Sequence, residues 1–330
     1  MEREYIGVDL HKQFFQACAV TPSGDRLWEA RFARTDEGLT QFRRHCGVQT
    51  AIAVEACGPT WPFVDAVAPT GARVAVVDPR KTKLKAGFAA KTDRLDARRL
   101  ADALRRESVV SIYVPPPAIR ELREVCRGRH HLVRLRTRAS QMIRALLLRC
   151  GAADVPVRRV YSARGLAWVS QVPLSPDASA SLQRLRRVLE AVQDQAAAAE
   201  AALMTRAQAD PIAVALDTLT GIGPILGLTI RAEVGDIARF ARGAELASYA
   251  GLVPRVDASA DRYRTGRITR QGSPWLRWAF IEAAMHTVRR QDRTGRWARR
   301  LALRKGAGKA RVACARVLCD DIVAVWPKGV

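Results

Sequence analysis

A long hydrophobic run is missing from this 330-residue sequence, so we expect no membrane-spanning helix. Its longest uncharged stretch, residues 218–230, is shorter than the roughly 20 residues that cross a bilayer. Gly221, Gly223 and Pro224 also interrupt that stretch. The charged start at residues 1–4 has none of the pattern of a signal peptide. A role in a membrane or outside the cell is therefore not expected.

Metal-binding sulfur and imidazole groups are also few. The seven cysteines include no Cys-x-x-Cys pair, and their odd number predicts neither a disulfide framework nor a zinc knuckle. The five histidines are scattered, and only His130 and His131 are adjacent, so we do not expect a histidine-based metal site. These absences favour a protein of a reducing cytoplasm.

Acidic residues are scarce beside basic ones. The sequence has 32 Asp and Glu against 55 Lys and Arg, a net charge of +23, and a pI near 10.9. Such an excess indicates a polyanionic partner, either nucleic acid or an anionic membrane surface. Lysine is scarce too, since 47 of the basic residues are Arg, which suits bidentate phosphate contacts. A GC-rich genome that favours Arg codons explains the same ratio equally well.

The positive charge is unevenly distributed along the chain. Residues 1–79 hold 8 basic and 10 acidic side chains, a net of −2, which leaves +25 for residues 80–330. Two stretches concentrate it: residues 120–160 have 11 Arg against 3 acidic residues, and residues 262–305 have 13 Lys and Arg against 2. We expect the middle and C-terminal parts to hold nucleic acid, with Arg262, Arg264, Arg267 and Arg270 among the contacts.

The N-terminal third shows the pattern of an α/β layer. Apolar or alternating segments predict strands at residues 5–9, 14–20, 26–34, 51–55 and 74–78, with helices at 36–46 and 59–67. Turn chemistry at residues 21–25 separates the second and third strands. This order predicts a mixed sheet with flanking helices, in which active groups lie at strand ends. A short extended run, residues 109–114, then leads to a proline boundary at 115–117.

The remainder of the sequence reads as mostly helical. Residues 118–149 predict an Arg-rich helix, residues 151–180 are irregular, and helices are expected at 274–290 and 309–325. A 4-3-4-3-4 spacing predicts a coiled-coil seam, pairing as a hairpin or across a dimer, although an ordinary amphipathic helix fits as well. The seam consists of Leu185, Leu189, Val192, Ala196, Ala199 and Leu203.

Residues 213–233 resemble a helix-hairpin-helix. Its glycine turn, with Gly221 and Gly223, exposes backbone N–H groups at a helix N-terminus. Such groups and the helix dipole can hold a phosphate without reading base sequence. A plain turn between two helices is the alternative interpretation.

Four carboxylates are the candidate metal ligands. Asp9 and Glu55 end predicted buried strands, while Thr92 can cap a helix from 93 to 106 that places Asp93 and Asp96 on one face. Mg²⁺ prefers oxygen ligands, and paired ions support in-line phosphoryl transfer. Taken singly, Asp9 fits a strand-end cap, and the helical pair fits a solvated face or partners for neighbouring arginines.

These segments resemble the DEDD transposases of the IS110 family of insertion sequences. The likeness runs in order over nearly the whole chain. The motifs that carry it are 5–12 (YIGVDLHK), 54–59 (VEACGP), 91–101 (KTDRLDARRLA), 219–224 (LTGIGP), 233–236 (EVGD) with Phe240, 246–254 (LASYAGLVP), and 266–273 (GRITRQGS) with Leu276 and Arg277.

The resemblance implies a fold and a domain order. It implies a RuvC-like domain of RNase H fold at residues 1–115, a coiled-coil helical region used in dimerisation at 116–208, and a mostly helical transposase domain at 209–330. It also implies a dimer or tetramer that acts on element ends and target DNA with a structured non-coding guide RNA, at the bacterial nucleoid in the cytoplasm.

The resemblance also implies the chemistry. Asp9, Glu55, Asp93 and Asp96 correspond to the acidic set that binds Mg²⁺, with Mn²⁺ as the alternative ion. Ser259 stands five residues after the Pro of the Gly-Leu-x-Pro motif, where the family has its nucleophilic serine, but Ala260 replaces the usual glycine. Ser248 and Ser273 are better explained by packing or helix capping. Alternative functions are a RuvC-like nuclease that hydrolyses branched DNA and an inactive nucleic-acid-binding remnant.

Overall fold

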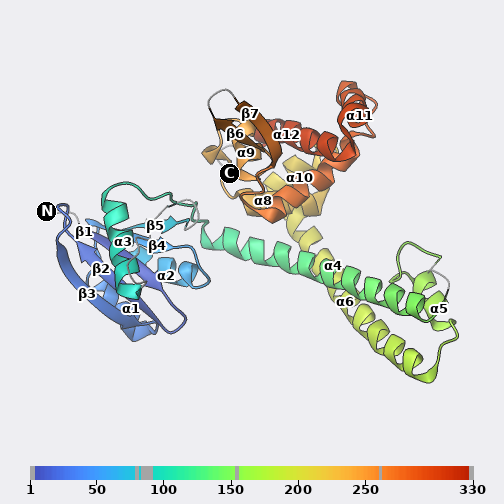
Figure 1. Ribbon diagram of the computed structural model, residues 1–330, viewed down its shortest axis with the longest axis horizontal. Coiled ribbons are helices and arrows are strands. Elements are labelled where there is room, and N and C mark those ends of the chain that lie inside the picture. Colours follow the sequence, from blue (N-terminus) through green and yellow to red (C-terminus); the bar gives the residue numbers. More distant parts are fainter. Residues whose placement is uncertain (1–3, 79–81, 83–91, 153–155, 260–261, 327–330) are drawn as a thin grey trace. The chain divides into compact units, whose positions relative to one another are not determined.

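A computed structural model shows two compact units, residues 1–114 and 115–330 (Figure 1). The structure describes residues 4–78, 82, 92–152, 156–259 and 262–326, and only the backbone within 256–265. Two residues of the motifs above, Lys91 and Ala260, lie outside the described residues. Within the part described, no helix is both long and apolar enough to cross a membrane.

The first unit is built on a mixed five-stranded sheet. Its strand order is β3-β2-β1-β4-β5, with β1 antiparallel to β2, β2 antiparallel to β3, and β1, β4 and β5 mutually parallel. The two central parallel strands therefore end side by side at one edge. The strands are β1 (Glu4–Leu10), β2 (Phe14–Val20), β3 (Arg26–Ala33), β4 (Thr50–Glu55) and β5 (Arg73–Val77).

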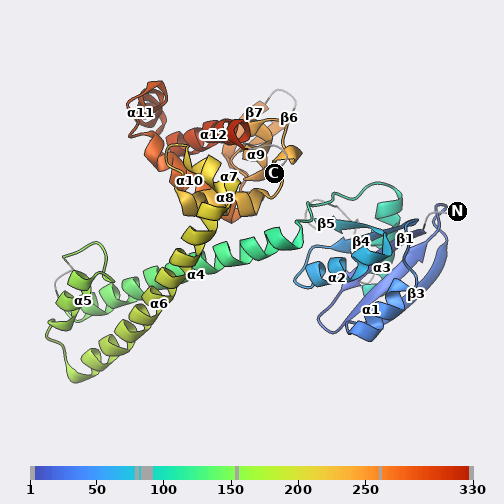
Figure 2. The same ribbon diagram turned by 180° about the vertical axis from the view of Figure 1, so that it is seen from behind.

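Helices cover both faces of this sheet (Figure 2). On one face, α1 (Asp36–Arg43) and α2 (Thr60–Val67) close an aromatic core, and a short 3₁₀ turn (Ala68–Thr70) follows α2. On the other face, α3 (Asp93–Arg105) packs on the central strands. The alternation of side chains along each strand sends one set to each layer. The aromatic core contains Phe15, Phe32, Phe42 and Phe63.

The predicted strands and helices of this unit are confirmed to within a few residues. The predicted extended run 109–114 is not a strand of the sheet, and it pairs with β5 at the isolated bridge between Val77 and Ser111. The prolines that follow, at 115–117, have no N–H to continue a ladder.

The second unit begins with a long helical hairpin. Helix α4 (Pro117–Arg149) pairs with α6 (Pro176–Ala209), and the contacts Arg129 to Glu200 and Arg136 to Gln193 show that they run antiparallel. The predicted seam is thereby confirmed as a hairpin within one chain. Its buried members, Leu189, Ala196 and Leu203, recur every seven residues, and Leu182, which was not part of the predicted seam, continues the series one heptad earlier.

One further helix lies in a segment predicted to be irregular. Residues 163–170, in the connection between α4 and α6, form α5 (Ala163–Ser170), which packs against the C-terminal part of α4 and the N-terminal part of α6. The hydroxyl of Ser162 caps it by accepting a hydrogen bond from the Gly165 N–H at 3.1 Å. The prolines at 156, 173 and 176 led to the prediction of an irregular segment, but all three lie outside residues 163–170 and so do not interrupt the helix.

The rest of the second unit is a mostly helical layer with one β-hairpin. Helices α9 and α11 and the β6–β7 hairpin were not predicted; α11 and β7 lie in the Arg-rich stretch 262–305, which was interpreted by its charge. A large apolar core, with Leu246, Leu276 and Phe280 fully buried, joins the helices. The elements are α7 (Pro211–Asp217), α8 (Pro224–Val234), a 3₁₀ turn (Ile237–Arg239), α9 (Gly243–Tyr249), β6 (Pro254–Ser259), β7 (Arg262–Ile268), α10 (Pro274–Thr287), α11 (Arg293–Lys305) and α12 (Ala307–Val325).

The cysteines provide a test of this packing. Cys57 and Cys150 are exposed, whereas burial raises the pKa of half-buried Cys46 to about 12 and of buried Cys126 to about 11. Because the thiolate is the reactive form, we expect a short iodoacetamide pulse at pH 8 to label Cys57 and Cys150 first. Peptide mass spectrometry would show this, with denatured protein labelled at all seven cysteines as the control. Rapid labelling of Cys126 would contradict the packing of α4.

Candidate metal centre and nucleic-acid interface

Strand register places Asp9 and Glu55 at the same level of the sheet. The parallel strands β1 and β4 are paired as far as Val8 with Val54, and Asp9 and Glu55 each follow by one residue. Val8 and Val54 belong to the core under α1 and α2. Because side chains alternate, Asp9 and Glu55 lie on the opposite face, where α3 packs.

Helix α3 brings the other two carboxylates to that face. The Thr92 hydroxyl caps the helix by accepting a hydrogen bond from Leu95 N–H at 3.4 Å, which confirms the predicted cap. Asp93 and Asp96 both lie in the first turn. The predicted helix and its shared acidic face are therefore present, at the end of the sheet where Asp9 stands.

Gly7 sets how closely α3 approaches the sheet. A Cβ at this position would lie 1.9 Å from the carbonyl oxygen of Ala97 and 2.4 Å from the backbone nitrogen of Ala101. The helix therefore rests directly on the backbone of β1. This contact places the first turn of α3 beside Asp9, two residues further along the strand.

His11 joins the carboxylates, which sequence reasoning did not foresee. Its Nε2 lies 3.2 Å from an Asp9 carboxylate oxygen and 3.4 Å from one of Asp93, and its ring stacks on Phe14 with centroids 4.6 Å apart. The sequence feature that could have predicted this contact is the i, i+2 spacing of His11 from Asp9, because that spacing puts two residues of an extended chain on one face. The histidines were considered in the sequence only as scattered residues and not by their spacing from the carboxylates.

The electrostatics of Asp9 reflect this crowding. Burial raises the pKa of Asp9, the neighbouring His11 lowers it, and the charges of Asp93 and Asp96 raise it. Carboxylates in such proximity repel one another unless a cation or a donor compensates them. Asp96 has a partner of its own, since Arg99 lies 3.1 Å from its carboxylate.

The group fits a divalent cation. One ligand atom each from Asp9, His11 and Asp93 lie within 4.8 Å of one another, a spacing that one ion can bridge. Oxygen ligands are those that Mg²⁺ prefers, and imidazole suits transition metals better. The chemistry of the donors therefore supports a cation site at this edge.

Ser259 lies in the other unit, at the end of β6. It is paired in register with Arg262 across the β6–β7 hairpin, and its side chain lies outside the described residues. Of the two alternatives, Ser273 is confirmed as a helix cap, because its hydroxyl accepts a hydrogen bond from Leu276 N–H at 3.2 Å. Ser248 is an exposed residue of α9.

The two glycines of the predicted helix-hairpin-helix differ in their surroundings. Gly221 has φ +95°, and a Cβ on it would lie 2.4 Å from the Ala283 carbonyl oxygen, so packing against α10 accounts for it. Gly223 is the N-cap of α8 and has open space where a Cβ would stand. The phosphate-binding interpretation therefore concentrates on Gly223.

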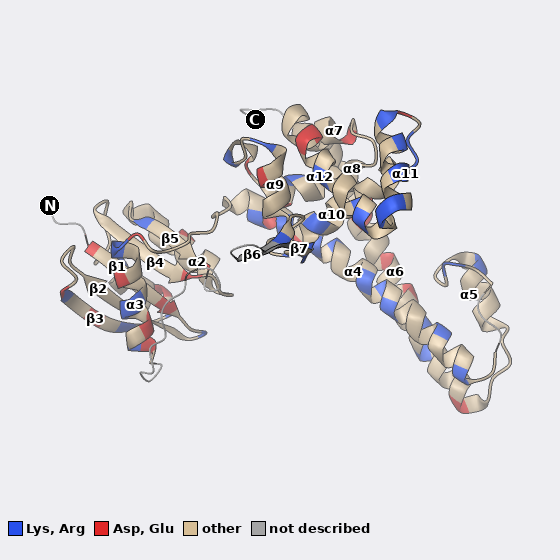
Figure 3. Cartoon of the chain, turned by 45° about the horizontal axis from the view of Figure 1, so that its top comes forward, with Lys and Arg blue, Asp and Glu red and all other residues tan. Residues whose placement is uncertain are grey.

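Two of the four candidate arginines in and near the β6–β7 hairpin have described side chains, and both lie on the surface. Arg267 and Arg270 are exposed, and Arg270 has a positive φ of 54°, a conformation uncommon for non-glycine residues. The side chains of Arg262 and Arg264 lie outside the described residues. Figure 3 shows many further Lys and Arg residues along α4 and α11.

Part of the first basic stretch is structural. Glu233 of α8 is 1 % exposed, and its carboxylate accepts two hydrogen bonds from Arg127, at 2.8 and 3.0 Å, and one from the Ser273 hydroxyl at 2.8 Å. Arg123 donates to the backbone carbonyls of Ala232 and Glu233, each at 2.7 Å. These arginines of α4 hold α8 and are not free for nucleic acid.

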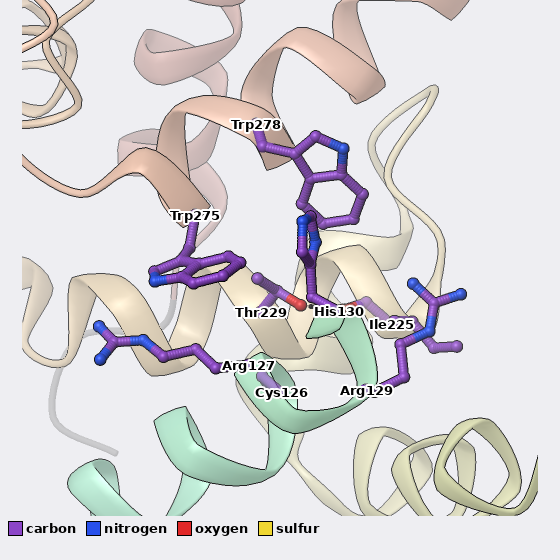
Figure 4. Close-up of a pocket in the computed structure, with 8 residues that line it drawn as sticks. All are labelled: Cys126, Arg127, Arg129, His130, Ile225, Thr229, Trp275 and Trp278. Atoms are coloured by element: carbon purple, nitrogen blue, oxygen red, sulfur yellow. Dashed lines mark hydrogen bonds between the residues drawn. The ribbon is translucent and has the colours of Figure 1, made fainter. Parts of the chain in front are cut away.

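A small cavity adjoins this junction (Figure 4). The His130 ring of α4 points between two tryptophans of α10, with centroids 4.6 Å from both Trp275 and Trp278. Burial and the nearby Arg134 and Arg129 lower the pKa of His130. The cavity holds about 10 Å³, no more than a single water molecule needs, so this aromatic cluster packs α4 against α10.

Comparison with known proteins defines the class. Residues 6–151 match the model of DEDD transposases of the IS110 type, and residues 213–299 match the model described as "Transposase IS116/IS110/IS902 family". Both matches, in chain order, identify a DNA transposase, an enzyme of DNA recombination. The chain belongs to the IS110 family. The DEDD family also indicates use of a divalent metal, and the cluster of Asp9, His11 and Asp93 is a possible place for it.

Curated relatives agree along the chain. The chain is 27% identical to the "Transposase for insertion sequence element IS1111A" of Coxiella burnetii, over 94% of this chain and 86% of that protein. It is 28% identical to the "Probable family 20 transposase" of Pseudomonas aeruginosa, over 96% of this chain and 94% of that protein. The transposase of element IS1328 from Yersinia enterocolitica is 25% identical over 89% of this chain and 86% of its own length.

Proposed function

We propose that this transposase moves an insertion sequence by Mg²⁺-dependent cleavage and rejoining of DNA through a covalent bond to Ser259. The observation that carries the proposal is the cluster of Asp9, His11 and Asp93, whose ligand atoms lie within 4.8 Å of one another. Asp96 belongs to the same first turn of α3 as Asp93, and Glu55 lies on the same face of the sheet by strand register. Carboxylates gathered at one edge are the groups that phosphoryl-transfer sites use to bind divalent ions.

The first unit is an RNase H-like domain in this proposal. Three antiparallel strands followed by two parallel ones in the order β3-β2-β1-β4-β5 support it. The acidic residues at the ends of β1 and β4, and on the helix that covers them, support it as well. The proposed domain boundaries remain residues 1–115, 116–208 and 209–330.

The acidic residues have a defined task. Asp9, Glu55, Asp93 and Asp96 would hold Mg²⁺, which when bound neutralises developing charge on the phosphate oxygens. The His11 imidazole orients Asp9 and Asp93 through its contacts at 3.2 and 3.4 Å. Gly7 keeps the helical and strand carboxylates at a fixed spacing.

Ser259 supplies the nucleophile in this scheme. Its hydroxyl oxygen forms a bond to phosphorus while the bond from phosphorus to the deoxyribose oxygen breaks. The serine proton passes to a base, and the leaving oxygen takes up a proton. Attack by the hydroxyl of a second strand then reverses these events, restores a phosphodiester and frees the serine.

The partners follow from charge and family. Element ends and target DNA bind the surface that includes Gly223, Arg262, Arg264, Arg267 and Arg270, with a structured guide RNA selecting the DNA. A dimer or tetramer would bring Ser259 of one copy to an acidic site, in the same copy or another.

A suicide substrate tests the covalent step. An element-end DNA with a nick beside the cleaved bond releases a short fragment and prevents reversal, so the wild-type protein should accumulate a protein–DNA adduct in Mg²⁺. We expect Ser259→Ala and Asp9→Asn to form none on a denaturing gel, because one lacks the nucleophile and the other a metal ligand. Ser248→Ala, a change at an exposed serine of α9, is the matched control and should form the adduct normally.

Two outcomes would overturn parts of this proposal. An adduct formed by Ser259→Ala would remove the serine from its role, and cleavage unchanged in Asp9→Asn would remove the metal site. A second candidate function is hydrolytic cleavage of branched DNA, which the location of all four carboxylates within the first unit favours. That activity would cut the substrate without any adduct.

A further inference from the structure

A polar groove lies beside the acidic residues on the same face of the sheet. It holds about 410 Å³ and is lined by Gln16, Glu29 and Arg31 of the sheet and by Thr92, Asp93 and Arg94 at the start of α3. Asp93 thus belongs both to the acidic cluster and to the wall of the groove. Any strand of nucleic acid that reaches the cluster has this groove as its neighbour.

Strand register places Arg31 in line with Asp9. Asp9 of β1 is paired with Gln16 of β2, and Gln16 is paired with Arg31 of β3. Directly paired residues lie on the same face, so all three belong to the face covered by α3. Two strand spacings separate Asp9 from Arg31, about 10 Å. A nucleic-acid strand advances roughly 3.4 Å per nucleotide along its axis, so Arg31 reaches a phosphate within about three nucleotides of the reacting one.

The charges of the groove leave Arg31 available. The Glu29 carboxylate is compensated by Arg94 at 3.1 Å and Arg26 at 3.5 Å, and Gln16 donates to it at 3.5 Å. Among the residues that the structure describes, Arg31 has no carboxylate partner, and its side chain is exposed.

Packing holds the Arg31 side chain in place. Its guanidinium carbon lies 3.4 Å from the centroid of the Phe14 ring, and the same ring stacks on His11. Stacking on an aromatic ring orients the planar group and limits its rotamers. A guanidinium fixed in this way loses less entropy when it forms two hydrogen bonds to a phosphate.

We infer that this groove is a subsite for the nucleic-acid backbone, in which Arg31 binds a phosphodiester next to the one that reacts. The inference rests on the proposed function, because it takes the acidic cluster as the place of reaction. Arg31 is a positioning residue that holds the strand in register with Asp9 and Asp93.

Methylphosphonate substitution tests the subsite. An element-end DNA carries one neutral methylphosphonate at successive positions on either side of the cleaved bond, and single-turnover cleavage and binding anisotropy are measured for each DNA. In the wild type, one flanking position should weaken binding and cleavage about ten- to a hundredfold, the range for a lost hydrogen bond to a charged group. Arg31→Ala should show that loss on unmodified DNA and no further loss at that position.

Two variants make the result specific. Arg26→Ala removes the same charge from the same strand outside the groove, and it should keep the wild-type sensitivity at every position. Arg31→Lys keeps the charge but loses the planar fork, and it should recover only part of the affinity. Arg31 is exposed and outside any described ion pair, and Glu29 keeps its contact with Arg94 when exposed Arg26 is replaced, so circular dichroism should show all three variants folded.

Sensitivity of Arg31→Ala equal to that of the wild type at every position would overturn the subsite, as would loss of sensitivity in Arg26→Ala. Failure of the proposed function gives a different pattern, because Asp9→Asn would then still cleave. If Asp9→Asn is inactive while Arg31→Ala retains full sensitivity, only the subsite is wrong.

Discussion

Replacing Glu233 by alanine is expected to destabilise the second unit by about 3–5 kcal/mol, the range for breaking a buried ion pair. Glu233 is 1 % exposed, and its carboxylate accepts hydrogen bonds from Arg127 and Ser273. Without it, the Arg127 guanidinium stays partly buried with no counter-charge, and the hydrogen bonds that this carboxylate accepts from Arg127 of α4 and from Ser273 at the start of α10 are lost. Urea unfolding followed by circular dichroism would measure the change.

An exposed ion pair on the same hairpin is the matched control. Arg186 lies 3.1 Å from Glu190, and their side chains are 31% and 40% exposed, so Glu190→Ala should cost less than about 1 kcal/mol. Equal losses for Glu233→Ala and Glu190→Ala would show that burial of the Glu233 carboxylate does not increase its contribution to stability. A double-mutant cycle with Arg127→Ala would isolate the coupling between Arg127 and Glu233.

Gly7→Ala is expected to damage both stability and strand cleavage. The added methyl would overlap backbone atoms of α3, at 1.9 Å and 2.4 Å, and backbone cannot yield as a flexible side chain does. Overpacking of this kind costs about 1–3 kcal/mol. As α3 moves away from β1, Asp93 and Asp96 move away from Asp9, so cleavage should fall more than the loss of folded protein explains.

The control for Gly7 is a glycine with room beside it. Gly47 belongs to the same unit, and a Cβ there would meet no atom within 4 Å, so Gly47→Ala should leave the thermal midpoint and cleavage near wild-type values. Thermal unfolding and single-turnover cleavage would be compared for the two variants. A Gly7→Ala protein with wild-type cleavage would contradict the close fit of α3.

Local pattern accounted for much of the first unit. Alternation and turn residues located its strands, because a half-buried strand next to a turn carries a strong local signal. Pairing is less local: the order of the strands, and the face on which Asp9 and Glu55 meet, depend on contacts between distant segments. The seam of α6 was visible in the sequence, but the choice between a hairpin within the chain and a dimer was not.

The sequence predicted only part of the site, for a related reason. The four carboxylates could be predicted from strand ends and a capped helix. The positions of His11 and Arg31 depend on their contacts with the Phe14 ring, which the sequence does not show. The sequence showed Glu233 only as part of a family motif, and Arg123 and Arg127 only as part of a basic stretch. Their burial and mutual contacts depend on the fold. Composition alone does not separate an arginine that binds Glu233 from one that faces solvent.

The contact between Gly7 and α3 has a consequence for how this protein tolerates mutation. Because helix and strand meet backbone to backbone at Gly7, the approach of α3 to β1 at this point does not depend on a side chain of the strand. Aliphatic exchanges at Ile6 or Val8, which point to the other layer, can alter packing there while the carboxylates keep their positions. Position 7 has no such latitude, whereas exchanges in the layer under α1 and α2 leave the acidic cluster intact.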